Sequence, residues 1–433
     1  MALERTKTAR DAIALMGKLA VEGGFYGEDN VEGTGESFIV VDKTEVWVFH
    51  VLASDAQGSS AVWAAARVPD GHVTVVPNIF VIRGMDLSDT DNYLASVNIY
   101  DVAKTNGWWD GNKETFDFTK VYSAGEYNHR YYSGRRWWGA MKIMAPNLVF
   151  PSNYTNLRDD APYPFSVALD SPTMNSSSNK QPPNKLAVAD VARVMRSFYE
   201  GTPFDLTVGL AAGAFGDPNR YDGEIERPGQ PGVQGAWERS IAIYRTDYSH
   251  ILEIDPTLPA DTGALMWFAP VGAHTSCYVP FFAGQDTLLP SYGVGHKGGL
   301  VDRQHSAMWA FRYVQQVATI RYSRMIADIN ELQDAMFQRA VTMQQQAAQS
   351  LHGNASGLAA VANAHAALVV KSWWALADHL VYKYADGNIY TDASDKTSGK
   401  STPAGYPTWW LTAVGYPSGP PPPVSGVFVE GRD

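Results

Sequence analysis

The chain has 433 residues, 45% of them hydrophobic and 18% charged, which is the composition of a globular protein with a sizeable core. Its 34 basic and 45 acidic residues give a net charge of −11, and no dense cluster of lysine and arginine occurs, so nucleic acid is not an expected partner. No apolar run is long enough to span a bilayer, which argues against a membrane partner. The single cysteine, Cys277, excludes an internal disulfide and a multi-cysteine zinc site.

The first eighty residues predict a helix followed by an antiparallel sheet. Thr8 and Asp11 resemble a capping box, and the apolar helical face that follows ends at Gly23 and Gly24. Alternating apolar residues bounded by turn residues then predict four strands of one meander. The predicted strands are residues 37–42, 45–51, 61–68 and 72–76.

The middle of the chain has weaker patterns. Helical spacing predicts helices at residues 135–145 and 188–199, and a short helix is an option at residues 94–104. Residues 148–181 are polar and contain proline, which predicts a long surface loop with an insertion.

Residues 209–250 combine a glycine-rich bend with several arginines. The bend GLAAGAFGDPNRYDG ends in Pro218, Asn219 and Arg220, and glycines there allow close approach of the backbone. The segment GAWERSIAIYRTDYSH predicts an alternating strand with Arg239 and Arg245 at its ends. Arginines beside such a bend suit a carboxylate ligand, but composition alone favours a surface turn with solvated arginines.

The last third is mainly helical. Residues 264–269 and 275–280 predict buried strands, and residues 302–351 and 359–384 predict two long helices in an antiparallel hairpin. The proline-rich residues 418–423 predict a loosely packed segment near the C-terminus. Together the elements indicate an α+β protein in which helices cover mostly antiparallel sheets.

Ten segments in order resemble the C69 dipeptidase family of N-terminal-nucleophile hydrolases. They include ESFIVVDKTEVWVFHV, RRWWGAMKIMAPNL and GALMWFAPVGAHTSCYVPFFAG, besides the two motifs of residues 209–250. The matching segments extend from residue 4 to about residue 335: 4–27, 36–51, 63–78, 135–148, 163–167, 194–207, 209–223, 235–251, 263–284 and 307–326.

The resemblance implies an αββα sandwich of two antiparallel sheets flanked by helices, and a cysteine-type peptidase that cleaves dipeptides without a cofactor. On this basis we expect an αββα domain at residues 1–300, a helical hairpin at 301–385 and an extended tail at 386–433. In the family an N-terminal cysteine is the nucleophile. Its own α-amino group is the base, because that group titrates near neutrality.

The sequence departs from the family at its start. Residues 1 and 2 are Met and Ala, so neither supplies a nucleophile, and the chain resembles the family without its amino-terminal, cysteine-bearing part. No signal peptide is present, and the chain begins within a helical pattern, which suggests the remainder of a longer protein. We therefore expect no peptidase activity from this chain alone, and leave open a homo-oligomer or a missing amino-terminal segment as its partner.

The resemblance also suggests site residues. Asn78, after the predicted fourth strand, is a candidate to stabilise an oxyanion or orient the substrate; the alternative is a turn-forming asparagine after proline. Arg220, Arg239 and Arg245 compete to bind the dipeptide carboxylate, with the first two preferred. For each arginine the alternative is a structural ion pair, for instance Arg239 with Glu238 or Asp217.

Other chemistries have weaker support. A Cys277–His274 nucleophile is rejected because an apolar strand would place the two side chains on opposite faces. The histidines are scattered without an HExxH motif, so no catalytic metal is expected.

A non-enzymatic alternative is a truncated homologue with a structural or interaction role, for which Trp409 and Trp410 are candidate anchors. The sequons at Asn153, Asn175 and Asn354 are candidates for glycosylation. They point to a secretory, lysosomal or extracellular location, with the cytoplasm as the alternative.

Overall fold

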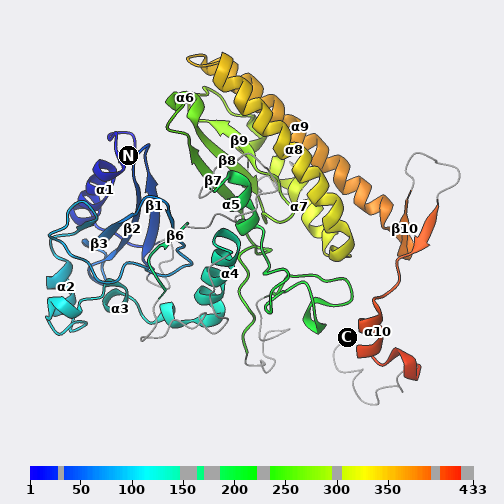
Figure 1. The fold of residues 1–433 in the computed structure, drawn as a ribbon, viewed down its shortest axis with the longest axis horizontal. Coiled ribbons are helices and arrows are strands. Elements are labelled where there is room, and N and C mark those ends of the chain that lie inside the picture. The colour runs from blue at the N-terminus through cyan, green and yellow to red at the C-terminus, as the bar shows by residue number, and fades with distance from the viewer. Residues whose placement is uncertain are drawn as a thin grey trace.

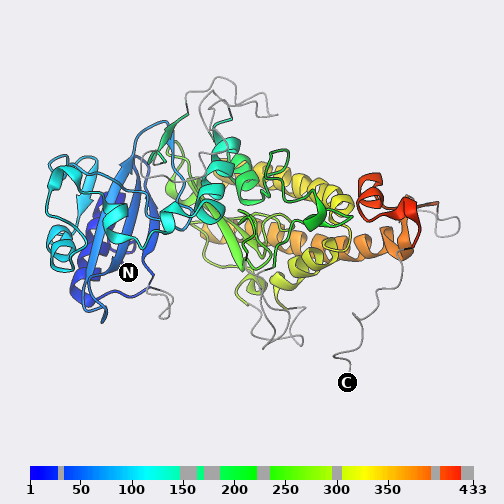
Figure 2. The same ribbon diagram turned by 90° about the horizontal axis from the view of Figure 1, so that it is seen from below.

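The computed structural model describes residues 1–27, 34–146, 163–169, 186–221, 235–294, 305–391 and 400–420. It is a mixed α and β protein with antiparallel sheets and helices, as the sequence predicts for the fold class. Figure 1 shows the N-terminal sheet on one side and two helices in the middle, α4 (Arg135–Met144) and α5 (Val188–Met195). Two long helices, α8 (Tyr322–Ser350) and α9 (Ala355–Lys383), lie across a second sheet. Figure 2 shows the N-terminal sheet and the segment with α10 at opposite ends of the molecule.

The N-terminal sheet has the strand order β1-β2-β3-β5, and all its pairs are antiparallel. Its strands are β1 (Glu36–Val41), β2 (Val46–Ala53), β3 (Ala61–Val68) and β5 (Tyr93–Ala95). Side chains of a strand alternate between faces, so Trp47 and Phe49 pack beneath α1 (Ala9–Gly23) while Val48 faces a separate core cluster. Thr8 caps α1 by accepting from the backbone N–H of Asp11, as predicted.

The predicted fourth strand is wrong in its pairing. After the turn at Pro69, where the His72 N–H donates to the Pro69 carbonyl, strand β4 (His72–Val73) leaves the sheet and pairs with β6 (Val167–Ala168). The edge of β3 is taken by β5 instead. The turn residues reverse the chain locally, but they do not determine which distant segment offers a hydrogen-bonding edge.

Short helices connect the two sheets, and the predicted helix at residues 135–145 is confirmed as α4. The predicted helix at residues 188–199 ends early, at Met195, and Tyr199 has a left-handed φ of 65°, which a helix cannot include. The helices of this region are α2 (Ile99–Thr105), α3 (Phe118–Tyr122), α4 (Arg135–Met144) and α5 (Val188–Met195). A π-helical turn, η3 (Arg130–Gly134), leads directly into α4.

The second sheet has the order β7-β8-β9 and is antiparallel. Its elements are β7 (Tyr248–Ile254), α6 (Ala260–Gly263), β8 (Ala264–Pro270) and β9 (Val279–Phe282). One face, with Ile251 and Trp267, packs in a core cluster with residues of α5, α8 and α9. On the other face Leu252 is 59% and Met266 37% exposed. The predicted strand at residues 275–280 is wrong except at its end, because a turn occupies residues 273–275.

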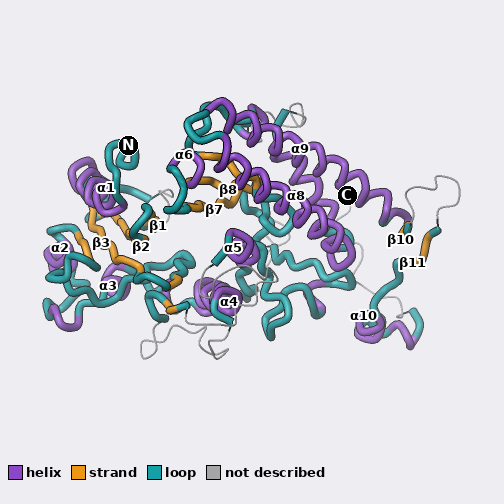
Figure 3. Tube along the Cα trace, turned by 45° about the horizontal axis from the view of Figure 1, so that its top comes forward, coloured by secondary structure: helices purple, strands orange, loops and turns teal. Residues whose placement is uncertain are grey.

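Three long helices follow: α7 (Ala307–Ala318), α8 (Tyr322–Ser350) and α9 (Ala355–Lys383). The predicted helix at residues 302–351 is therefore two helices, separated at Thr319–Arg321, where Arg321 has a non-helical φ of −149° and ψ of 58°. The break could not be recognised from the apolar spacing, because Val314 before it and Met325 after it belong to the same core cluster. Figure 3 shows α8 and α9 side by side.

Beyond α9 the described residues contain two short strands and a short helix, besides two 3-10 turns. They are β10 (Asn388–Tyr390), β11 (Ser401–Pro403) and α10 (Thr408–Ala413). Trp409 of α10 is 44% exposed. Among the helices that the structure describes, none combines the length and the apolar character needed to cross a bilayer.

Candidate functional site

Asn78 lies on the surface, in the loop after β4, with a left-handed φ of 57°. Asparagine tolerates this conformation better than most residues. The chain after it is anchored, because Ile79 and the three residues that follow are buried and the Val81 N–H donates to His50 Nε2 at 3.0 Å. The backbone of Asn78 is thus held in place from the side of the N-terminal sheet.

Arg136, in the first turn of α4, determines how the Asn78 amide is oriented. Its Nη1 donates to Asn78 Oδ1 at 2.7 Å, its Nη2 to the Pro77 carbonyl at 3.1 Å and its Nε to the Tyr132 carbonyl at 2.9 Å. A guanidinium only donates, so the amide must present its oxygen to Arg136. The two N–H donors of Asn78 Nδ2 consequently point away from Arg136.

Arg239 approaches the same residues from the loop before β7. Its backbone N–H donates to the Tyr131 carbonyl at 2.9 Å, and the Tyr199 hydroxyl donates to its carbonyl. Its guanidinium carbon lies 5.2 Å from the centroid of the Tyr132 ring, and that of Arg136 lies 4.5 Å from the same centroid. Asn78, Tyr132, Arg136 and Arg239 are called the asparagine–arginine cluster below.

An ion pair between Arg135 and Glu238 joins the two segments that carry Arg136 and Arg239. The Arg135 Nε and Nη2 each donate to a carboxylate oxygen of Glu238 at 2.8 Å, and Arg135 is only 4% exposed. The two residues neighbour Arg136 and Arg239 in sequence, so the pair joins α4 to the loop before β7. A bidentate arginine–carboxylate pair fixes direction as well as distance.

The predicted strand with Arg239 and Arg245 at its ends is wrong. Residues 235–247 are a loop, and the strand β7 begins only at Tyr248. The segment follows backbone and side chains of the η3 and α4 region rather than a neighbouring strand, as the hydrogen bond from Arg239 to Tyr131 shows. Arg245 lies exposed further along this loop.

Arg220 holds the glycine-rich bend together. Its Nη1 donates to the carbonyls of Asp217 and Asn219, both at 3.0 Å, and its Nη2 to the Leu206 carbonyl at 2.9 Å. Burial lowers the pKa of Arg220, which the charge of Asp217 partly offsets. At Gly216, which has a φ of 68°, an added Cβ would lie 2.8 Å from the Thr207 carbonyl oxygen, so the bend needs a glycine there.

The sequence did not indicate Arg136, Tyr132, Glu238 or Tyr199 as members of a site. The double arginine at the start of α4 was a usable signal, because two adjacent charges on a mostly apolar helix need partners from other elements. Of the sequons, Asn354 is exposed and caps α9 by accepting from the Gly357 N–H at 2.9 Å. Asn153 and Asn175 lie outside the described residues.

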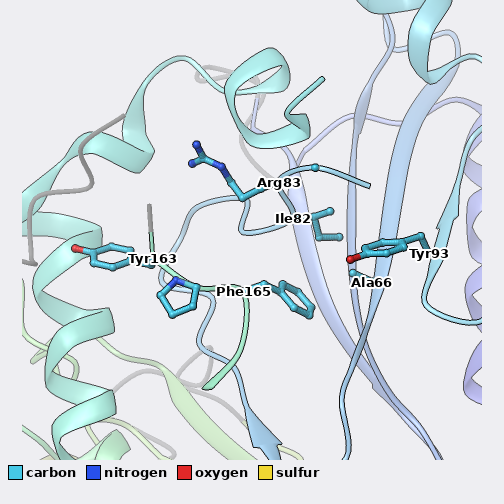
Figure 4. A pocket seen from close by; sticks show the side chains of 8 residues that line it. Ala66, Ile82, Arg83, Tyr93, Tyr163 and Phe165 are labelled. Atoms are coloured by element: carbon cyan, nitrogen blue, oxygen red, sulfur yellow. The ribbon is translucent and has the colours of Figure 1, made fainter. Parts of the chain in front are cut away.

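A pocket of about 300 Å³ lies between the N-terminal sheet and the segment before β6. Figure 4 shows Tyr163 on one side, Ala66 and Tyr93 on the other, and Phe165 and Ile82 between them. The volume is at the lower end of ligand pockets, and three of the eight lining residues are aromatic. The ring of Tyr163 also stacks on Trp137 of α4 with centroids 4.4 Å apart, which links the pocket to the helix that carries Arg136.

Cys277 is 1% exposed and precedes β9 in a loop rather than in a strand, so the reason first given against a Cys277–His274 pair is wrong. Burial raises the pKa of the Cys277 thiol to about 12 and lowers the pKa of His274 to about 3. At neutral pH the thiol therefore keeps its proton and the imidazole is uncharged, which is the reverse of an activated cysteine.

We predict that native Cys277 resists alkylation. Its raised pKa keeps the nucleophilic thiolate scarce below about pH 12, and burial blocks the reagent. Iodoacetamide at pH 8 should label the folded protein very slowly and the urea-unfolded protein at the rate of a free cysteine, as measured by intact mass. Equal rates in the two states would contradict the burial.

No group of three or more histidine, cysteine, aspartate or glutamate side chains suited to a metal ion occurs among the residues that the structure describes. The asparagine–arginine cluster offers hydrogen-bond donors, namely the guanidinium groups of Arg136 and Arg239 and the Asn78 amide, and such donors suit anions and carbonyl oxygens rather than metal ions.

Comparison with known proteins identifies the family of the chain that carries this site. A family model of peptidase family C69 matches residues 1–335. The chain belongs to peptidase family C69. All four residues of the asparagine–arginine cluster lie within the matched region.

Relatives of this C69 chain carry the names of dipeptidases or probable dipeptidases. It is 27% identical over 292 residues to a "Probable dipeptidase" of Salmonella dublin, covering 67% of this chain and 55% of the relative. It is 23% identical over 348 residues to "Probable dipeptidase A" of Streptococcus pyogenes serotype M1, covering 78% and 60%. It is 26% identical over 300 residues to a "Dipeptidase" of Bifidobacterium longum, covering 67% and 47%. The C69 chain thus spans only about half of the length of these relatives.

Proposed function

We propose that this C69 chain provides the substrate-orienting part of an enzyme that hydrolyses dipeptides. The proposal rests on the fixed amide of Asn78. Because Arg136 binds its oxygen, the Nδ2 donors are directed away from the protein groups that hold it and are available to a carbonyl oxygen. Donors fixed before the reaction are effective at stabilising the charge that develops on such an oxygen, because they need not reorganise.

The nucleophile of the proposed reaction is an N-terminal cysteine outside these 433 residues. The only cysteine in the sequence is Cys277, and its burial and raised pKa are incompatible with attack on a substrate. We propose accordingly that the isolated chain does not hydrolyse dipeptides, and that the cysteine-bearing part of the enzyme must be supplied to it.

We further propose that the two sheets become layers of an αββα sandwich in the complete enzyme. Supporting this, helix α1 covers one face of the N-terminal sheet, and α5 and α8 pack against one face of the second sheet. The opposite face of the second sheet exposes Leu252 and Met266 beside a groove of about 660 Å³. An apolar sheet face of this kind favours burial against another layer.

The test measures release of free amino acids from alanyl-alanine by the isolated chain and by the chain co-expressed with the amino-terminal, cysteine-bearing part of a C69 enzyme. We expect activity only in the second case, and a decrease in kcat of about 10²- to 10³-fold for Asn78→Ala. Hydrolysis by the isolated chain would refute the external nucleophile. Full activity of the Asn78→Ala complex would refute the role of the amide.

A further inference from the structure

Two arginines of the asparagine–arginine cluster have no acidic partner among the described residues. Two other arginines of the same region are paired with a carboxylate: Arg83 with Asp117 at 2.6 Å and Arg135 with Glu238 at 2.8 Å. For Arg136 and Arg239, by contrast, no carboxylate of the described residues lies within ion-pair distance. Two positive charges beside one tyrosine ring, without a counter-charge in the described part of the chain, favour the binding of an anion.

Electrostatics indicate that the two guanidinium groups are close enough to affect each other. Burial lowers the pKa of Arg136, and the charge of Arg239 lowers it further. An arginine side chain in a protein carries its positive charge at neutral pH. The repulsion between them is relieved when a negative group binds, so an anion gains more here than beside a single solvated arginine.

The positions of the two groups are set by the fold. Arg136 is fixed by its bonds to the carbonyls of Pro77 and Tyr132 and to Asn78, and the Arg239 backbone is fixed at both its N–H and its carbonyl. Ligand binding to groups that are already in place costs less conformational entropy. Both side chains are only half-buried, so a small ligand can reach them.

The contact between Arg136 and Asn78 specifies which anion fits. In a dipeptide the scissile carbonyl and the residue that carries the terminal carboxylate are joined by one peptide unit, about 3.8 Å between Cα atoms. The two groups must therefore be recognised by neighbouring residues. The guanidinium of Arg136 has five N–H donors, and its bonds to Asn78, Pro77 and Tyr132 use three of them, so two remain for a carboxylate. Arg220 binds the carbonyls of its own bend and of Leu206 and makes no contact with Asn78, so it does not couple the two groups.

We propose that Arg136 and Arg239 together bind the terminal carboxylate of the substrate, with Arg136 also positioning the Asn78 amide over the neighbouring carbonyl. This inference rests on the proposed function, and it specifies a substrate with a free carboxyl terminus one peptide unit from the scissile bond. Arg136 thereby couples recognition of the chain end to orientation of the bond to be cleaved.

The experiment is a binding titration of the complete 433-residue chain with alanyl-alanine and with its C-terminal amide, by calorimetry or by NMR chemical shifts. The two ligands differ only in their terminal group, which is a negatively charged carboxylate in the acid and an uncharged carboxamide in the amide. We expect the acid to bind about tenfold or more tightly than the amide, and Arg239→Gln and Arg136→Gln each to remove this preference. Arg136→Lys should keep part of the preference, since it retains the charge but loses the planar fork.

The matched control is Arg193→Gln, which removes an exposed arginine of α5 and should leave both affinities unchanged. Circular dichroism establishes that each variant is folded. A general loss of structure would weaken the binding of both ligands, so it would not selectively change the ratio of the affinities for acid and amide. Equal binding of acid and amide by the unaltered chain, no binding of either, or a preference that survives in folded Arg239→Gln would overturn the inference. If the complemented enzyme hydrolyses the acid and the amide equally well, the carboxylate inference is wrong and the proposed function stands. If the chain binds the acid selectively but the complemented enzyme hydrolyses neither ligand, the inference stands and the proposed function is wrong.

Discussion

Replacing Glu238 with alanine should lower the free energy of unfolding by about 3–5 kcal/mol. Its carboxylate is the bidentate partner of Arg135, whose side chain is 5% exposed, so the substitution leaves a buried guanidinium without a counter-charge. The Nη1 of Arg135 already lacks a hydrogen-bond partner among the described residues. Urea unfolding followed by circular dichroism measures the loss.

The control for this prediction is Asp70→Ala, which breaks the ion pair between Asp70 and Arg67 at 2.8 Å. Asp70 is 85% exposed, and such a pair contributes at most about 1 kcal/mol. A double replacement of Arg135 and Glu238 by apolar residues of similar size should recover most of the stability. If Glu238→Ala proves no more costly than Asp70→Ala, the ion pair does not join α4 to the loop as the structure indicates.

Replacing Trp373 with alanine should also lower the free energy of unfolding by about 3–5 kcal/mol, through a cavity in the helical layer. Trp373 of α9 is fully buried, lies 5.4 Å from the Phe311 ring of α7 and donates from Nε1 to the Thr275 carbonyl at 2.9 Å. The substitution removes the packing and also leaves a buried carbonyl unpaired.

Trp409→Ala is the matched control, because the same side chain is removed from α10, where it is 44% exposed. We expect a change within about 0.5 kcal/mol for this surface position. Trp373→Phe should fall between the two, since it keeps most of the volume but loses the hydrogen bond. A similar loss for Trp373→Ala and Trp409→Ala would show that α9 does not carry the core of the helical layer.

The candidate site was only partly predictable from the sequence. Asn78 and Arg239 were identified through the family resemblance, and the structure brings both into one cluster. Arg220 was also identified, but its donors bind the backbone of its own bend. Arg136 was missed, because nothing in the local sequence shows that the first turn of α4 reaches the loop after β4.

The sequence by itself determined the elements whose hydrogen bonds close within a few residues. Helix α1 with its Thr8 cap, the β1–β2 hairpin and helix α4 follow from local periodicity and turn residues, because each makes its backbone bonds internally or with its neighbour in the chain. Tertiary structure alone decided that β4 pairs with β6, that Arg135 meets Glu238, and that Arg136 turns the Asn78 amide outward. These contacts join segments that are far apart in the chain, and their partners are selected by packing and charge in three dimensions, which no local pattern encodes.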